Sequence, residues 1–384
     1  MNWLRDNILK ILIILGITIV AIVIIALVFK PKGDEVVSGT KYGELETKLQ
    51  NAAIKYIDRH KKKLPTTTEY VTKIKLSTLI SNNYIGKLVA IDNPGTKCDG
   101  YVEIAKISDD GDDYRYTPFI SCGEYYRTKT IGDYIIDTET KDGTFERITD
   151  AGLYKIGDEY VFRGENVNNH ILLDDHLYRI IKIDKDKSLQ LISVDRTENT
   201  YTWDDRYNIE KNRDVGINTF TKSRLYEELG HLYENKDEEN FERFFTTKEK
   251  DYIVEHDFCV GRRSLNDGSI YSGAECKETA PLKVGLISLN EYARASIDPN
   301  CKSVFDMSCS NYNFFSNLGK KSSYSYFTLT GVLDNTYDFY RIRYNEVTEA
   351  KASTSSQLYP VIYINSKSIY SSGTGVYTDP YVIR

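Results

Sequence analysis

The chain has 384 residues, of which 41% are hydrophobic and 28% charged, and its formal net charge is −6. This length indicates two or three domains. Its 24 glycines and 8 prolines are too few for a collagen-like or disordered chain. The acidic balance argues against a nucleic-acid partner. We attribute most of the 31 tyrosines to β-strand composition.

The first distinctive segment is an apolar run of 19 residues, 11–29, interrupted only by Gly16 and Thr18. As a helix it spans about 28 Å, which is enough to cross the hydrocarbon core of a bilayer. Lys10 and Lys30 bracket the run, and no small-residue cleavage site follows it. We therefore predict an uncleaved signal anchor, with a stub at 1–10, a transmembrane helix at 11–29 and a linker at 30–40.

The orientation of this anchor rests on the cysteines, because the basic residues on its two sides are equal in number. All six cysteines lie downstream of the run, which favours an oxidising compartment there. Four basic residues and one acidic residue give residues 1–32 a net charge of +3, so the downstream part carries −9. We expect a single-pass protein of the cell membrane, with its N-terminus cytoplasmic and its remaining domains extracellular.

A small α+β domain is expected at 41–127, and it begins with a helix at about 40–62. Six apolar residues recur there at helical spacing and predict one buried face, namely Tyr42, Leu45, Leu49, Ala52, Ala53 and Tyr56. Pro65 forbids continuation of this helix. A second, short helix is expected to begin with Ser77 as its N-cap and to end at Gly86.

The clearest hairpin joins residues 98–106 to residues 114–122. If residues whose numbers sum to 220 are paired, Val102 faces Pro118 on a mostly apolar face, and Tyr101 faces Phe119 on the other. The same register brings Cys98 opposite Cys122, which predicts a disulfide. Pro118 indicates that the second strand lies at a sheet edge.

Residues 128–157 read as a connector of polar strands and turns, and a larger β-rich α+β domain is expected at 158–384. Its predicted strands include 176–183 and 188–195, which form a hairpin, and a helix is expected at 221–234. Thr246 and Ser288 are each followed three residues later by a glutamate, which is the pattern of a capping box at a helix start.

Four cysteines lie in the larger domain: Cys259, Cys276, Cys301 and Cys309. They allow three pairings, of which proximity in sequence favours Cys259–Cys276 and Cys301–Cys309. A zinc site would require ligands closer in sequence than these. We favour disulfides over zinc or free thiols.

Three polar segments resemble binding sites. His170 and His176, with Asp174 and Asp175 between them, have metal-binding side chains, the acidic segment Asp109–Asp113 offers oxygen ligands for Ca²⁺, and Trp203–Asp205 is similar to calcium-binding strings of lectins. A polar turn or solvated loop explains each more simply. We find no nucleophile, phosphate-loop or metalloprotease motif. We therefore predict no catalytic residue, no cofactor and no metal ligand.

Two stretches of the chain resemble known bacterial surface domains. LSTLISNNYIGKL, NPGTKCDGYVEI and YTPFISCGEYY are similar to pilin-like ectodomains of surface proteins from Firmicutes and their wall-less Mollicutes relatives, over about residues 1–127. The start MNWLRDNILK lacks the processing site of type IV prepilins. YVFRGENVNNHILLDDHLYRIIKID and KVGLISLNEYARASID resemble uncharacterised bacterial surface domains, whose tail is distantly similar to C-type-lectin-like and formylglycine-generating-enzyme-like folds.

These resemblances imply a membrane-anchored surface protein that displays a binding or adhesion module on a pilin-like stalk. Its expected ligand is an extracellular glycan or protein. Two alternatives stay open: a minor subunit of a pilus-like or secretion assembly, and an extracellular enzyme with Cys301 and Cys309 as a redox or metal pair.

Overall fold

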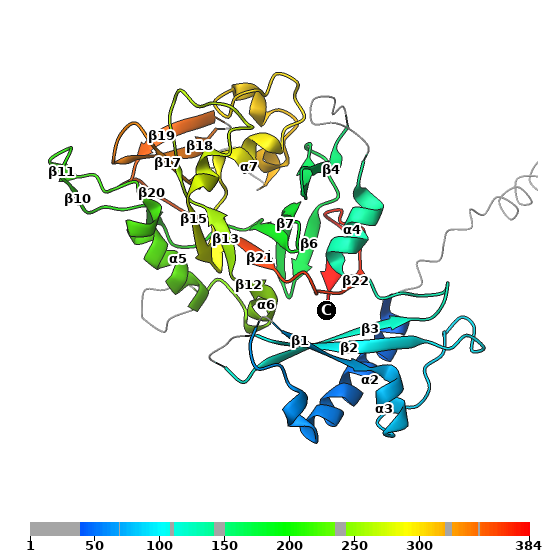
Figure 1. Cartoon of the computed structure of the whole chain (residues 1–384). Helices are drawn as coiled ribbons and strands as arrows, with labels where there is room; N and C mark the ends of the chain where they lie inside the picture. Colours follow the sequence, from blue (N-terminus) through cyan, green and yellow to red (C-terminus); the bar gives the residue numbers. More distant parts are fainter. Residues whose placement is uncertain are drawn as a thin grey trace, which may run out of the picture.

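The computed structural model describes residues 39–68, 70–107, 111–141, 150–234, 243–318, 325–344 and 346–384. The predicted stub, the predicted transmembrane helix at 11–29 and nearly all of the linker lie outside these ranges. Within them, no helix is both long enough and apolar enough to cross a membrane. The described chain is α+β with a β-rich body, and Figure 1 shows a small domain beneath a larger one, with the C-terminus between them.

The small domain is a three-stranded antiparallel sheet in the order β1-β2-β3, with helices on one face. Its core includes Tyr42 and Leu49 from the first helix and Val102, Ile104 and Ile120 from the sheet. The elements are α2 (Gly39–Asp58), η1 (Lys61–Lys63), β1 (Val71–Lys75), α3 (Leu76–Ser81), β2 (Asp99–Lys106) and β3 (Tyr114–Ser121). The sequence did not lead us to expect β1, which runs directly into α3.

The predicted hairpin register is confirmed. Val102 pairs with Pro118 and Tyr101 with Phe119, and Cys98 and Cys122 form a disulfide. Strand β3 lies at the sheet edge, where a proline costs no ladder hydrogen bond. The apolar face of β2 is therefore buried against the helices, and the opposite face is turned toward the larger domain.

Both predicted helix ends in the small domain need correction. Helix α2 ends at Asp58 rather than near 62, where His60 Nδ1 lies 2.7 Å from Tyr56 O and satisfies one of the last carbonyl groups. Helix α3 begins at Leu76, so Ser77 is not its N-cap. The chain leaves this helix at Asn83, which has a left-handed backbone with φ of 59°, and not at Gly86 as expected. Tyr84 N donates to Leu79 O at 2.9 Å and closes the helix end.

The segment expected as a polar connector contributes to the larger domain instead. Helix α4 (Ile131–Glu139) starts at Thr130, whose side chain accepts a hydrogen bond from Asp133 N. Ile131 and Ile135 are completely buried in the larger core. Strand β4 (Gly152–Ile156) then pairs with the next strand, β5. The cap and the four-residue spacing of Ile131 and Ile135 favour a helix here, although the helix has only nine residues.

The larger domain is built around a ten-stranded mixed sheet whose main path is β12-β21-β8-β7-β6-β23-β22, with β4, β5 and β16 attached at its side. Its strands are β5 (Glu159–Arg163), β6 (His170–Leu173), β7 (His176–Ile183), β8 (Leu189–Ser193), β12 (Ile253–Val254), β16 (Val284–Gly285), β21 (Val361–Ile364), β22 (Tyr370–Ser372) and β23 (Tyr381–Ile383), together with β4. The predicted strands at 176–183 and 188–195 are confirmed as β7 and β8.

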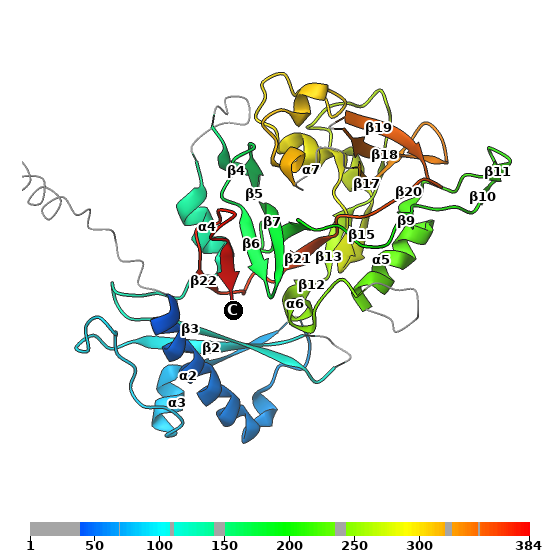
Figure 2. The same ribbon diagram turned by 180° about the vertical axis from the view of Figure 1, so that it is seen from behind.

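Smaller sheets surround this one (Figures 1 and 2). A four-stranded sheet contains β14 (Arg262–Arg263), β17 (Ser325–Val332), β18 (Asp338–Arg343) and β19 (Glu346–Lys351). Three pairs are formed by β13 (His256–Cys259) with β15 (Thr279–Leu282), β9 (Tyr201–Thr202) with β20 (Ser355–Ser356), and β10 (Tyr207–Asn208) with β11 (Arg213–Asp214). The last pair projects from the body in both views.

Short helices cover the edges of these sheets. They are η2 (Phe220–Lys222), α5 (Arg224–Glu234), α6 (Thr247–Tyr252), η3 (Ala274–Lys277), α7 (Leu289–Arg294), η4 (Met307–Ser310) and η5 (Phe314–Asn317). The helix expected at 221–234 is thus confirmed as α5 after a short η2. The capping boxes Thr246–Glu249 and Ser288–Glu291 are both formed, at the starts of α6 and α7.

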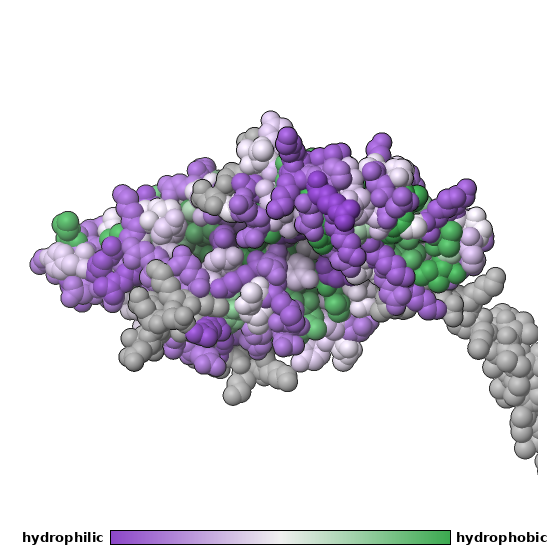
Figure 3. Space-filling model, turned by 90° about the horizontal axis from the view of Figure 1, so that it is seen from below, coloured by the Kyte–Doolittle hydropathy of each residue, from purple (hydrophilic) through white to green (hydrophobic). Residues whose placement is uncertain are grey.

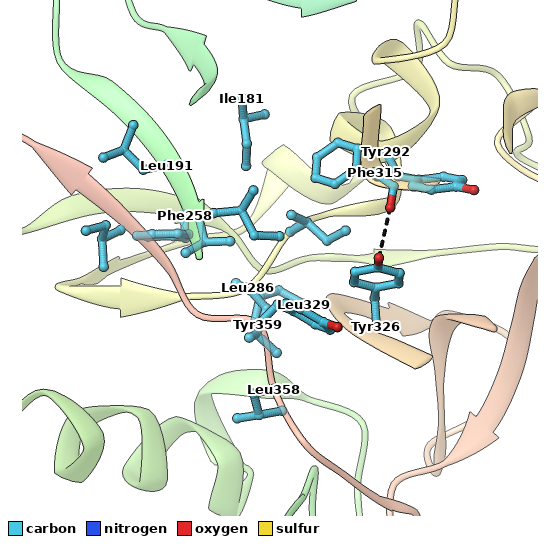
Figure 4. Packing of buried hydrophobic residues seen from close by; sticks show 14 of the residues in the cluster. Ile181, Leu191, Phe258, Leu286, Tyr292, Phe315, Tyr326, Leu329, Leu358 and Tyr359 are labelled. Carbon is cyan, nitrogen blue, oxygen red and sulfur yellow. Dashed lines mark hydrogen bonds between the residues drawn. The ribbon is translucent and has the colours of Figure 1, made fainter. Parts of the chain in front are cut away.

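One hydrophobic core joins the sheets of the larger domain. Figure 4 shows Ile181 and Leu191 of the central sheet near Phe258 and Leu286, while the Tyr326 hydroxyl donates to Phe315 O at 2.8 Å. Disulfides Cys259–Cys276 and Cys301–Cys309 join the flanking segments. All six cysteines are paired as expected.

Removing the Cys98–Cys122 disulfide by a double Cys→Ala substitution should lower the unfolding free energy of the small domain by about 3.5 kcal/mol, because the bond closes a loop in the unfolded chain. The same change at Cys301–Cys309 should cost about 2.6 kcal/mol, since that loop is shorter. Denaturant titrations of the two double variants check this order, and an equal or reversed loss would contradict it.

Candidate functional site

The two domains meet through charged contacts on the outward face of the small sheet and on helix α2. Lys367 of the larger domain lies 3.1 Å from the Glu103 carboxylate on β2. Arg115 on β3 donates to the backbone oxygen of Asp251 at 2.7 Å. Glu46, fully buried on α2, forms an ion pair with Arg384. Two grooves lie where the two domains meet.

The larger space, which we call the wide groove, has a volume of about 830 Å³. One wall is the row Lys75, Tyr101 and Phe119 across the three strands, and the other is the start of α4. Further lining residues are Ser77, Asp99, Gly100, Ile120, Ser121, Arg127, Thr128, Lys129, Asp133 and Asp137. Most of the residues that line the wide groove are therefore polar or charged, and two aromatic rings lie in its wall.

The aromatic pair in this wall is ordered by its neighbours. The Tyr101 ring lies between Lys73 Nζ, 4.8 Å from the ring centre, and Phe119, whose ring centre is 5.2 Å away. Both faces of Tyr101 are thus occupied. Among the described residues Phe119 has no second ring contact, and its position on edge strand β3 leaves its outer side next to the groove.

The charges around the wide groove are only partly neutralised. Lys129 and Asp137 form an ion pair at 2.8 Å. Lys75 and Arg127 are exposed, and neither forms an ion pair with another described residue. These two cations are free to bind a polar ligand. The Thr128 hydroxyl is not, because it donates to Glu46 and accepts from Ile120 N.

A second, narrow groove of about 300 Å³ is lined in part by Lys367. It is bounded by Arg115 and Thr117 of β3, by Lys248 and Asp251 of α6, and by Arg384. Each groove is lined by residues of both domains, and we call the region that holds the two grooves the cleft. Seen from below, the surface is largely hydrophilic, with hydrophobic residues in separate groups (Figure 3).

A separate cavity of about 290 Å³, which we call the α7 pocket, lies in the larger domain. Glu159 accepts from Lys182 at 2.9 Å and from Arg294 at 2.5 Å. Lys182 also lies 3.3 Å from Asp184. The carboxylate of Glu291 reaches the same pocket, where it accepts a hydrogen bond from Ser288 N at 2.7 Å.

The pKa values of the two glutamates in this pocket, Glu159 and Glu291, are shifted in opposite directions. Burial alone would raise the pKa of Glu159, but Lys182 and Arg294 lower it overall. Burial raises the pKa of Glu291, and Lys182 offsets this only in part. For Lys182, burial acts to lower the pKa, while Tyr363, Glu159 and Asp184 raise it on balance. Sequence reasoning missed this pocket, although a lysine inside a buried strand was a signal for it.

The histidines considered as metal ligands are not brought together on an ion. His170 Nδ1 lies 3.3 Å from Gly375 O, and His176 Nδ1 lies 2.9 Å from the buried Glu249 carboxylate. Asp174 lies in the β6–β7 turn and pairs with Lys248 at 3.0 Å. Among the described residues no cluster of three or more His, Cys, Asp or Glu side chains is arranged to hold a metal ion.

The segment Trp203–Asp205, which resembles a calcium-binding segment of lectins, has its first two side chains buried inside the protein. Trp203 is completely buried and stacks on Phe339 at 4.6 Å between ring centres. Asp204 is also buried, and its two oxygens accept from Arg206 Nε at 2.7 Å and from Ile217 N at 2.8 Å. Both of these hydrogen-bond donors to the Asp204 carboxylate therefore belong to the protein itself.

The acidic hairpin tip is only partly within the described residues, because Asp109 and Asp110 lie outside them. Asp113 O accepts a backbone hydrogen bond from Ile107 at 3.0 Å and so closes the turn.

The cysteine pair considered as a redox or metal site is a disulfide. Cys301 and Cys309 are bonded to each other and are 7% and 1% exposed, so neither sulfur is presented to solvent.

His176 gives the structure a testable pH dependence. Its hydrogen bond to Glu249 raises its pKa, so the stabilisation is complete below the unfolded value of about 6.5 and is lost as pH rises through the higher folded pKa. The melting-temperature advantage of the wild type over His176→Gln should be largest near pH 5 and shrink toward pH 8.5. A difference independent of pH would contradict this.

Comparison with known proteins gives no assignment. No family model matches the chain, and no curated protein or solved structure shows significant similarity to it. Any function must therefore be argued from the residues and geometry of the chain itself.

Proposed function

We propose that this chain is a membrane-anchored extracellular surface protein that binds a glycan chain in the wide groove between its two domains. The observation that carries the proposal is the groove itself, with about 830 Å³ of open space on the face of the small sheet that is not packed on the helices. The apolar run at 11–29 supplies the anchor, and the pilin-like resemblance of the small domain suggests its role as a stalk.

The composition of the groove favours a saccharide over an apolar peptide. Its walls carry hydroxyl, carboxylate and cationic groups, which hydrogen-bond to sugar hydroxyls. Phe119 supplies a ring against which the C–H face of a sugar can pack. A peptide that binds by apolar anchors would need hydrophobic pockets, and this lining offers few apolar side chains.

Extracellular placement is supported by the cysteines. Three disulfides in one chain are typical of proteins in oxidising compartments. No specific contact favours a pilus-like assembly or an enzyme over a binding module. The pairing of Cys301 with Cys309 supplies no exposed thiol for the redox or metal alternative.

Topology can be tested with the full-length chain in the membrane of intact cells. A protease added outside should digest the domains downstream of residue 30, because the proposal places them on the outer side. An antibody blot against a C-terminal tag measures the loss. Protection of the tag in intact cells, with digestion only after lysis, would refute the extracellular placement.

Ligand binding can be tested by screening full-length protein in detergent on polysaccharide arrays. Phe119→Ala and Arg127→Ala should each weaken binding to the selected glycan by about tenfold, the size expected for losing a packed ring or a charged hydrogen bond. Tyr207→Ala is the matched control, because Tyr207 is a 54% exposed aromatic residue on β10, away from the cleft. Equal effects of all three changes, or selective binding of peptides in the groove, would refute the glycan assignment.

A further inference from the structure

The α7 pocket is a second place where the chain can hold a ligand, separate from the cleft. Its lining includes the Cys259–Cys276 disulfide and the start of α7. Its volume of about 290 Å³ lies at the small end of ligand sites in proteins. Such a space suits a molecule no larger than a monosaccharide.

The charges that line this pocket are unequally satisfied. Glu159 takes both cations of the pocket, since it contacts Lys182 and Arg294 directly. Lys182 is shared further with Asp184. His256 Nε2 lies 3.7 Å from the same Asp184 oxygen. The cations of the cluster therefore have their direct ion pairs with carboxylates other than Glu291, and Lys182 acts on Glu291 only at longer range.

Glu291 is the second glutamate in the lining of the α7 pocket. Its hydrogen bonds come from the backbone of Ser288 and from the side chain of Gln190, and it has no ion pair with any other described residue. A carboxylate removed from water without a cation is costly. A positively charged ligand group in the pocket would relieve this cost.

The rest of the lining indicates what kind of cation fits. Tyr271 is 64% exposed and lines the pocket, so its ring can cover a cationic or hydrocarbon part of a ligand. A metal ion would require more oxygen ligands than one unpaired carboxylate provides. An ammonium group has three donors and can satisfy Glu291 together with neutral acceptors.

We propose that the α7 pocket binds a small molecule carrying a primary ammonium group, with the ammonium on Glu291 and the remainder of the molecule against Tyr271. An amino sugar has the right size and chemistry. This site does not depend on the glycan groove, so either one can exist without the other.

The test compares glucosamine with N-acetylglucosamine, which has the same ring but no positive charge. Calorimetric titration of the full-length chain should show binding of glucosamine and at least tenfold weaker binding of N-acetylglucosamine. Equal affinity for the two sugars, or no binding of glucosamine, would overturn the proposal.

Two variants locate the site. Glu291→Gln should weaken glucosamine binding at least tenfold, whereas Glu249→Gln, which alters the corresponding capping box of α6 outside the pocket, should leave it unchanged. Equal losses in both variants would assign the effect to helix capping and overturn the proposal.

Tyr271→Ala provides a readout that does not depend on the fold of α7, because this side chain is mainly exposed. It should weaken glucosamine binding about threefold, the size of an exposed cation–ring contact. Unchanged affinity in both Tyr271→Ala and Glu291→Gln would place the sugar elsewhere. Phe119→Ala, in the wide groove, should have no effect.

Discussion

The two-residue alternation of the β2–β3 hairpin is the constraint on which the domain arrangement depends. A shift of one residue in the pairing would exchange the two faces of both strands. In the observed register, Val102 and Ile104 are buried against the helices. Tyr101, Glu103 and Phe119 are consequently on the face toward the larger domain. The Glu103–Lys367 contact and both grooves exist because this face is not needed for the core of the small domain.

Local patterns in the sequence were enough to predict much of this fold. The hairpin register, the three disulfides and the two capping boxes each depend on residues close together in the chain, and the structure has all of them. The short strand β1 and helix α4 were missed, because β1 has only five residues and α4 is a nine-residue helix in which acidic residues alternate with the apolar ones.

The candidate site could not be predicted from local sequence patterns, because it depends on residues that are far apart in the chain. The wide groove is formed by residues of β1, β2 and β3 and by α4, and it requires the placement of one domain against the other. The same holds for the α7 pocket, where Glu159, Lys182 and Glu291 come from three separate elements. Parallel pairs such as β6 with β23 also join distant parts of the chain, and no local spacing predicts them.

The two capping boxes show how one local motif takes different roles in different surroundings. Glu249 and Glu291 both accept a hydrogen bond from the backbone at the start of their helices. Glu249 is surrounded by His176 and the Tyr178 hydroxyl, which donate to it. Glu291 faces a cavity instead. The sequence pattern determines the helix start, while the partner of the remaining oxygen is decided by tertiary packing.

The three disulfides have a mechanical consequence for the chain when it is pulled from its ends. A pulling force can extend only the residues that lie outside closed loops. The loops have sequence separations of 24, 17 and 8 residues, and at about 3.4 Å per residue they withhold roughly 160 Å from the stretched chain. At the same rise the 384 residues of the chain would reach roughly 1,300 Å, so the three loops shorten the stretched chain by about an eighth and keep the residues inside them from being extended.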